Sequence, residues 1–260
     1  MAVGGNIASI SPAWTESDST LHGERLMTID AYRFDYLIEL EDGQKSRFQI
    51  ELDPETLTML PATPEPYPAW TQLAYRQCQC CPLSPKTRLY CPIAVNISEL
   101  VDRFKDILSH KHCTVVCETS DRVYSKKTSA MEGLTSVFGI VMATSNCPVM
   151  NFLKPMARFH LPFASVEETT VRSTSFFLLG EYFHYKNGRA QQFDFDKLEK
   201  RYERVQLVNE GLLSRIQSLG NQDADKNAII TLHSLSQFLS LEMDFSLTTI
   251  EHLFDGCDDA

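Results

Sequence analysis

The chain has 260 residues, of which 43% are hydrophobic and 22% are charged, a composition typical of a folded globular protein. Its formal net charge is −10, and the short basic runs at Lys126–Lys127 and Lys197–Arg204 stand among acidic residues. We therefore expect no nucleic-acid partner, because phosphate binding needs a basic surface. The longest apolar stretch, Val137–Ala143, is far shorter than the roughly 20 residues that cross a bilayer, so we expect no membrane partner.

The N-terminal residues Met1–Trp14 have neither the basic start nor the apolar centre of a signal peptide. We therefore expect a cytoplasmic protein. In that compartment the eight cysteines would be free thiols or metal ligands rather than disulfides. Residues 1–28 are polar and rich in Ser, Gly and Thr, which favours a flexible arm.

Two runs of alternating apolar and polar residues, 32–40 and 48–52, flank Asp42-Gly43 and predict a β-hairpin. The next residues, Asp53-Pro54-Glu55, have the pattern of a helix start: a capping side chain, a proline at the first position and an acid in the first turn. A short helix is therefore expected over 54–60.

Prolines, capping signals and hydrophobic periodicity set the expected elements of the middle of the chain. Capping boxes at Ser129–Glu132 and Ser165–Glu168 are predicted to start two of its helices. In chain order we expect a linker (61–70), a cysteine-rich loop (76–92), a helix (97–109), two paired strands (112–119 and 122–126), a buried helix (130–144), a short helix (149–157) and a long helix (165–184).

The C-terminal third has the pattern of a helical hairpin. Its first helix contains the apolar seam between Phe195 and Leu219. A second helix is expected over 226–241 and a short one over 246–254. Asn209 at a core position of the first helix would suit a dimeric coiled coil, whereas the breadth of the apolar stripe favours a helix packed within its own domain. The apolar seam of that first helix has heptad spacing and consists of Phe195, Leu198, Tyr202, Val205, Asn209, Leu212, Ile216 and Leu219.

Together these elements predict an α+β fold, in which an N-terminal β-hairpin and a cysteine-rich metal loop pack on a mainly helical body. We expect three parts: a flexible arm (1–28), an α+β domain with the metal site (29–190), and a C-terminal helical hairpin packed on the same domain (191–260).

The cysteines suggest a metal site. Cys78 and Cys81 have the C-x-x-C spacing with which one turn of a loop presents two sulfurs to a single ion. Cys91 follows ten positions later, and the fourth candidate is Cys147, because it shares a following proline with Cys81 and Cys91. Random composition would give fewer than one Cys-Pro dipeptide, whereas this chain has three.

The kind of metal stays open. Four thiolates suit a structural zinc ion, and they equally suit an iron–sulfur cluster. Cys80 would either replace Cys78 as a ligand or remain free, and a redox-active Cys78/Cys81 pair is a further alternative. Cys113, Cys117 and Cys257 are expected to be ordinary buried thiols.

Arg158 and His160 lie in a loop between two expected helices, not far from Cys147 along the chain. His160 would be a metal ligand or a general base if functional, although a hydrogen-bonded histidine at a helix junction explains the same pattern. No phosphate-binding loop, dinucleotide fingerprint or nucleophile elbow is present, so the sequence does not decide whether the protein is an enzyme.

Four motifs resemble those of an uncharacterised bacterial protein family, a domain of unknown function. The resemblance runs from the hairpin into the C-terminal helices, implies cysteines at the positions of the four candidate ligands, and implies that Cys80 is an addition. It implies no activity. The motifs are Cys81-Pro82-Leu83, Cys91-Pro92-Ile93-Ala94, Met142–Pro148 and Met156–Ala164.

The sequence therefore favours a structural zinc protein that acts as an interaction or assembly module, binding a protein partner or another copy of itself through its C-terminal helices. The alternatives are an iron–sulfur redox protein and a small-molecule enzyme with a pocket near Arg158 and His160.

Overall fold

We analysed a computed structural model, which describes residues 31–61, 66–104, 111–190, 194–218 and 247–255. These residues belong to one compact unit, which runs from Ala31 to the end of the chain. The expected arm (1–28) and the expected helix at 226–241 lie outside the described residues. Within the described part of the chain, no helix combines the length and the apolar character needed to span a membrane.

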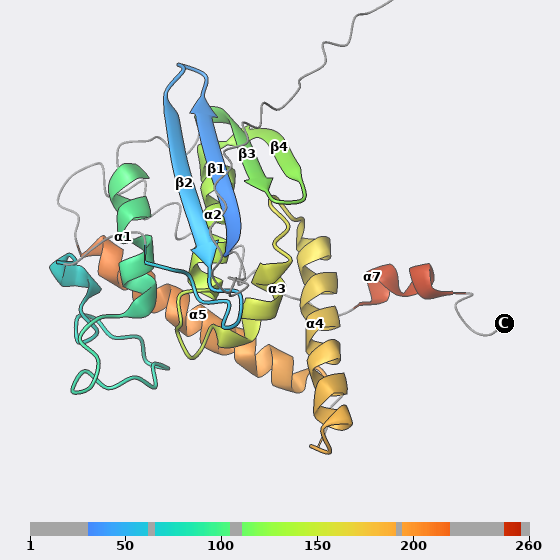
Figure 1. The fold of residues 1–260 in the computed structure, drawn as a ribbon. Coiled ribbons are helices and arrows are strands. Elements are labelled where there is room, and N and C mark those ends of the chain that lie inside the picture. Colours follow the sequence, from blue (N-terminus) through green and yellow to red (C-terminus); the bar gives the residue numbers. More distant parts are fainter. Residues whose placement is uncertain (1–30, 62–65, 105–110, 191–193, 219–246, 256–260) are drawn as a thin grey trace, which may run out of the picture. The chain divides into compact units, whose positions relative to one another are not determined.

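The chain builds one antiparallel sheet of four strands in the order β2-β1-β3-β4 (Figure 1). The predicted hairpin is confirmed, and Gly43 takes the positive φ of 85° that its turn requires. The sequence also predicted the second strand pair, but not that the two pairs join through β1 and β3. The strands are β1 (Tyr32–Leu40), β2 (Lys45–Leu52), β3 (His112–Thr119) and β4 (Val123–Ser129).

Helices make up most of the remaining described structure, so the predicted α+β class is confirmed. Single 3₁₀ turns lie at Ala69–Thr71, Asn151–Leu153 and His252–Phe254. The helices are α1 (Pro92–Phe104), α2 (Ala130–Ala143), α3 (Lys154–Arg158), α4 (Val166–Lys186), α5 (Asp196–Gln217) and α7 (Thr248–Glu251).

Helix α2 packs directly on the sheet and contacts β1, β3 and β4. Gly133 permits this approach, because a Cβ there would lie 2.6 Å from Val115 Cγ2. Val137, Ile140 and Val141 are at most 1% exposed. The apolar character of this segment on nearly all sides therefore does indicate a buried helix, as predicted.

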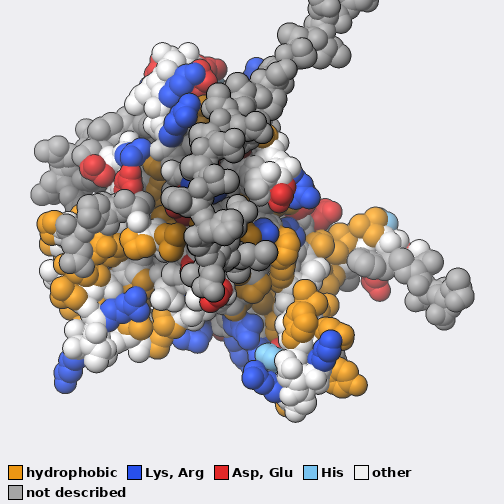
Figure 2. All heavy atoms as spheres, in the orientation of Figure 1, with side chains coloured by type: hydrophobic (Ala, Val, Ile, Leu, Met, Phe, Trp, Pro, Cys, Tyr) orange, Lys and Arg blue, Asp and Glu red, His pale blue; other side chains and the backbone are white. Residues whose placement is uncertain are grey.

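Helix α4, by contrast, leaves large apolar side chains in contact with solvent. Leu179, Tyr182, Phe183 and Tyr185 are 47%, 49%, 50% and 63% exposed. Figure 2 shows hydrophobic side chains gathered over the C-terminal half of this helix. Together with Leu178 these residues are called the α4 apolar surface below.

The helix expected over 54–60 is absent, and this prediction was wrong. Asp53 Oδ1 accepts hydrogen bonds from the backbone N–H groups of Glu55 (3.1 Å) and Thr56 (2.7 Å), as a helix cap would. However, Leu57 has a φ of 55°, and the chain turns back so that Met59 pairs with Leu52. The capping side chain therefore closes a turn that extends the sheet instead of starting a helix.

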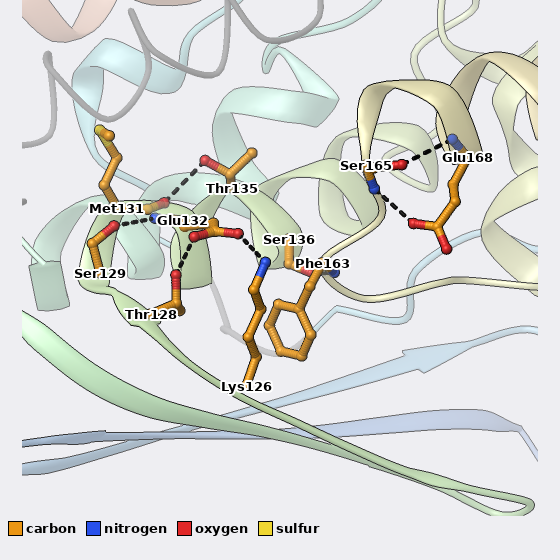
Figure 3. A network of polar contacts seen from close by, with 10 residues as sticks. All are labelled: Lys126, Thr128, Ser129, Met131, Glu132, Thr135, Ser136, Phe163, Ser165 and Glu168. Atoms are coloured by element: carbon orange, nitrogen blue, oxygen red, sulfur yellow. Dashed lines mark hydrogen bonds and ion pairs between the residues drawn. The ribbon is translucent and has the colours of Figure 1, made fainter.

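The capping box predicted at Ser129 is only half formed. Ser129 Oγ accepts from Glu132 N at 3.2 Å, but the Glu132 carboxylate accepts from Lys126 Nζ and Thr128 Oγ1 instead of closing the box (Figure 3). Strand β4 supplies both of these donors and thereby ties itself to α2. The box predicted between Ser165 and Glu168 is complete.

Helix α1 begins five residues earlier than predicted, with Pro92 at its first position, where the missing N–H costs no hydrogen bond. Residues 105–109 of the predicted helix lie outside the described range.

The described part of the heptad seam of α5 is buried, as the interpretation of a helix packed within its own domain predicts. Leu198, Val205, Leu212 and Ile216 are at most 2% exposed. Asn209 is 5% exposed, and neither its Oδ1 nor its Nδ2 has a partner among the described residues. A buried amide without hydrogen bonds costs stability.

Replacing Asn209 by leucine should therefore stabilise the protein. We expect the free energy of unfolding to rise by about 1 kcal/mol and the melting temperature by about 2–4 °C. Chemical and thermal unfolding measure both quantities. Glu210→Leu, at the exposed neighbouring position, should give no comparable gain. A loss of stability in Asn209→Leu would mean that the amide is in fact satisfied.

Candidate metal centre

The loop that carries the C-x-x-C motif is closed at its base by backbone hydrogen bonds. Leu73 N donates to Leu89 O at 2.7 Å, and Cys91 N donates to Thr71 O at 2.8 Å. Within the loop, Cys81 N donates to Cys78 O at 3.0 Å, which forms the tight turn expected of this spacing. The hydrogen bonds at the base of the loop thus hold Cys91 at the end of the loop that contains Cys78 and Cys81.

Helix α5 holds this loop from the side. Gly211 lies so close to Cys78 that a Cβ at position 211 would stand 2.5 Å from Cys78 Cβ. Along the same helix, Arg76 Nη1 donates to Ser214 Oγ at 3.0 Å, and the hydroxyl groups of Tyr75 and Ser218 are 2.5 Å apart. Any side chain at position 211 would displace the turn that presents Cys78.

Cys91 and Cys147 have the same local environment, and the proline after each one explains it. Burial raises the pKa of the Cys91 thiol, while hydrogen bonds from the backbone N–H groups of Ala94 and Ile93 oppose this rise. Burial raises the pKa of Cys147 to about 11, and the N–H groups of Val149 and Met150 oppose it in the same way.

In both Cys-Pro sequences, proline starts a helical turn without an N–H group of its own. The next two N–H groups then point at the sulfur, where they favour its thiolate form. Asn146, with a φ of 63°, reverses the chain after α2 and so brings Cys147 to this position.

The four predicted cysteines lie near one another, although Cys78 and Cys147 are far apart along the chain. The pKa of Cys78 is raised to about 12, first by burial and then by the charges of Cys81, Cys91, Cys80 and Cys147. Cys147 in turn is influenced by Cys91 and Cys81. That these four cysteines hold one metal ion stays a prediction.

The thiol side chains are not oriented as a finished coordination sphere. Within the described ranges, no three His, Cys, Asp or Glu side chains stand as ligands around one point. Each cysteine has a single rotatable bond before its sulfur, with three staggered positions, so the direction of each thiol can change by side-chain rotation.

A buried arginine lies beside the thiols. Arg215 on α5 is 1% exposed, and its guanidinium donates to the backbone oxygens of Trp70 (2.9 Å), Gln72 (2.7 Å) and Leu73 (3.1 Å). Among the described residues, no carboxylate forms an ion pair with it. Its charge acts on Cys91, where it favours the thiolate.

The other described cysteines have different environments. Cys80 Sγ donates to Arg204 O at 3.4 Å, so its hydrogen bond is directed at α5. Cys113 and Cys117 are buried on β3, as the sequence predicted. Cys257 lies outside the described residues.

The two residues that were expected near a pocket have different surroundings in the structure. Arg158 stacks over the ring of Tyr32, with its Cζ 3.6 Å from the ring centroid. His160 lines a cavity beside α2 that is described below. Its Nε2 is hydrogen-bonded to Tyr36 Oη at 2.5 Å, and Tyr36 Oη also contacts Ser136 Oγ at 3.0 Å. His160 thus has the hydrogen bonds of a histidine at a helix junction.

The pKa of His160 predicts an acid-sensitive fold. Burial, and then the charge of Arg172, lowers it from the ordinary value of 6.5 to about 3. Because the folded-state pKa is the lower one, stability is complete above about pH 6.5 and falls as the unfolded chain takes up a proton. We expect a loss of about 2 kcal/mol from pH 7 to pH 5, measured by urea unfolding.

His160→Asn should remove most of this pH-dependent difference, whereas His112→Asn, which changes an exposed histidine on β3, should retain it. An unchanged pH dependence in His160→Asn would contradict the assignment.

These features define an antiparallel α+β protein with a cluster of four thiols beside a buried arginine. The chain belongs to DUF6901, a family described as a domain of unknown function, which matches residues 31–255. The resemblance to an uncharacterised family is therefore confirmed. No curated protein and no solved structure matches the chain.

Proposed function

We propose that the protein is a metal-stabilised interaction module, in which Cys78, Cys81, Cys91 and Cys147 hold one structural zinc ion. The metal would tie the loop between Leu73 and Leu89 to the segment that follows α2, and both of these to α5. Such a site needs thiolates in a reducing compartment such as the cytoplasm.

The observation that carries the proposal is the match of charges. A zinc ion with four thiolate ligands has a net negative charge. Arg215 supplies a buried positive charge beside Cys91 that no carboxylate in the described part of the chain offsets. A buried cation and a buried anionic centre stabilise each other, whereas either one alone is costly.

The donor set also fits an iron–sulfur cluster, which takes four thiolates and is stabilised by N–H groups that point at sulfur. Zinc is favoured because the rigid turns at Cys91 and Cys147 suit a closed site around a single ion. A complete set of four protein ligands leaves no open position for a substrate, which argues against the enzyme alternative at this centre.

The interaction role is supported by the α4 apolar surface. Five large apolar side chains in the C-terminal half of one helix exceed the scattered exposure that is normal for a protein surface. A protein partner with a complementary apolar face would cover them. Self-association through the C-terminal helices stays a prediction, since the seam of α5 is buried and residues 226–241 lie outside the described range.

Metal analysis of protein purified without air tests the proposal. We expect one zinc per chain and no absorbance near 400 nm. A brown protein that contains iron would support the cluster instead, and a metal-free protein that remains fully stable would contradict both.

Two single substitutions sharpen the test. Cys91→Ser should lose the metal, whereas Cys80→Ser should keep it, because the Cys80 thiol donates to Arg204 O. Metal loss in Cys80→Ser with full retention in Cys78→Ser would exchange the roles of these two residues.

A further inference from the structure

A cavity of about 450 Å³ lies between α2, α3, α4 and the loop that joins α3 to α4. Its size falls within the range of small-molecule binding sites. Most of its wall is apolar, and Met150 and Met156 line it together with Ile140, Leu153 and Phe163. Methionine side chains adapt their shape to the molecule they contact, which suits a flexible ligand.

At Gly139, helix α2 has no side chain to occupy this cavity. Gly139 belongs to the wall, and a Cβ built there would meet no atom within 4 Å. Glycine in the middle of a helix costs about 0.5–1 kcal/mol relative to alanine. The sequence therefore has a helix-destabilising residue at a position of the cavity wall where a Cβ would meet no neighbouring atom.

Most charged groups around the cavity are already neutralised. Lys126 Nζ and Glu132 Oε1 form an ion pair at 2.5 Å, visible beside Phe163 in Figure 3. Glu168 does not line the cavity; its carboxylate accepts from Ser165 N at 2.8 Å as part of the helix cap, and it keeps a negative charge that acts on Arg172 without forming an ion pair with it. His160 is neutral, because burial and then Arg172 lower its pKa to about 3.

Arg172 is the exception. Its Nη2 donates to the backbone oxygens of Met156 (3.0 Å) and Phe159 (2.6 Å). Its Nε and Nη1 make no hydrogen bond to a described residue, and no described carboxylate lies within ion-pair distance. One wall of an apolar cavity thus presents a positive charge with donors to spare, which is a favourable site for one carboxylate.

We propose that this cavity binds a small aliphatic carboxylic acid, whose carboxylate pairs with Arg172 and whose chain lies along the methionine-lined wall. At the roughly 30 Å³ that a water-sized group occupies, the cavity holds an acid of about 10–15 non-hydrogen atoms. Among the described residues that line the cavity, Arg172 is the one cation without an ion-pair partner, which favours a monoanion over a phosphate ester with two charges. The inference does not depend on the metal centre.

Isothermal titration of the full-length protein with decanoate, below its micelle concentration, tests this site. Decanol has the same chain without the charge, and decylamine carries the opposite charge. We expect decanoate to bind at one site per chain and decylamine not to bind. Decanol should bind at least about tenfold more weakly than decanoate, because a hydrogen bond between charged groups raises the affinity by about tenfold or more.

Two kinds of variant separate the head group from the cavity. Arg172→Gln should weaken decanoate at least about tenfold and leave decanol unchanged. Gly139→Leu should remain folded and bind neither compound, because its side chain fills the cavity. Gly180→Leu, the matched change in α4 outside this cavity, should bind decanoate normally. Thr169→Leu provides a second filled cavity if Gly139→Leu does not fold.

The proposal is overturned if decanoate does not bind, if decanol binds as tightly as decanoate, or if a folded Gly139→Leu or Thr169→Leu variant keeps its affinity for decanoate.

Discussion

Replacing Cys147 by serine should remove the bound metal and lower the free energy of unfolding by about 3–5 kcal/mol. Cys147 is the only one of the four cysteines that lies beyond α2, so its loss separates the metal-bound loop from the end of that helix. Metal content is measured by elemental analysis, and stability by urea unfolding under reducing conditions.

A chelator distinguishes a structural metal from simple loss of a buried thiol. Chelation should destabilise the native protein by nearly as much as the substitution, and it should have little further effect on Cys147→Ser. Cys113→Ser, which also changes a buried thiol but lies on β3, should keep its metal and its sensitivity to chelation. Full metal content and full stability in Cys147→Ser would remove this residue from the site.

Replacing Arg215 by methionine should destabilise the protein by about 3–5 kcal/mol, although methionine is apolar and of similar length. The substitution leaves the carbonyl groups of Trp70, Gln72 and Leu73 without their donor in a buried region. It also removes the positive charge beside Cys91, so metal affinity should fall together with stability.

A double-mutant cycle separates these two effects of Arg215. If the guanidinium only satisfies carbonyl groups, the costs of Arg215→Met and Cys91→Ser will add. If it also balances the charge of the metal centre, the double variant will be less destabilised than the sum, by about 1 kcal/mol or more. Strict additivity would contradict the charge match on which the proposed function depends.

The sequence predicted the elements of this fold wherever local signals and tertiary packing agree. The hairpin around Gly43, the buried α2 and the capped start of α4 each combine a local signal with a matching hydrophobic pattern. The helix expected after Asp53 failed because a capping side chain also closes a turn, and only the pairing of Met59 with Leu52 decides between these outcomes.

The metal site itself stays a prediction, but the backbone geometry around two of its candidate cysteines follows from a local signal. A proline after cysteine sets the direction of the next two N–H groups, and this operates at Cys91 and Cys147 without knowledge of the fold. The contribution of α5 was not recognised, since Arg215 looks like an ordinary surface charge in a heptad pattern. Gly211 was a usable signal, because glycine inside a helix often marks a close approach.

The pocket was only partly predictable. The interval between α3 and α4 suggested Arg158 and His160, which are two residues apart, yet Arg158 stacks on Tyr32. Arg172 lines the cavity from the second turn of α4, and its position in that helix gave no indication of the residues around it. Side-chain direction across a helix junction depends on packing that spacing alone does not specify.

X-ray absorption spectroscopy at the zinc edge of anaerobically purified protein tests the central claim most directly. We predict four sulfur atoms at about 2.3 Å from the metal, falling to three in Cys147→Ser if any zinc is retained. A zinc environment dominated by nitrogen or oxygen, or one that is unchanged in Cys147→Ser, would contradict a single ion held by these four cysteines.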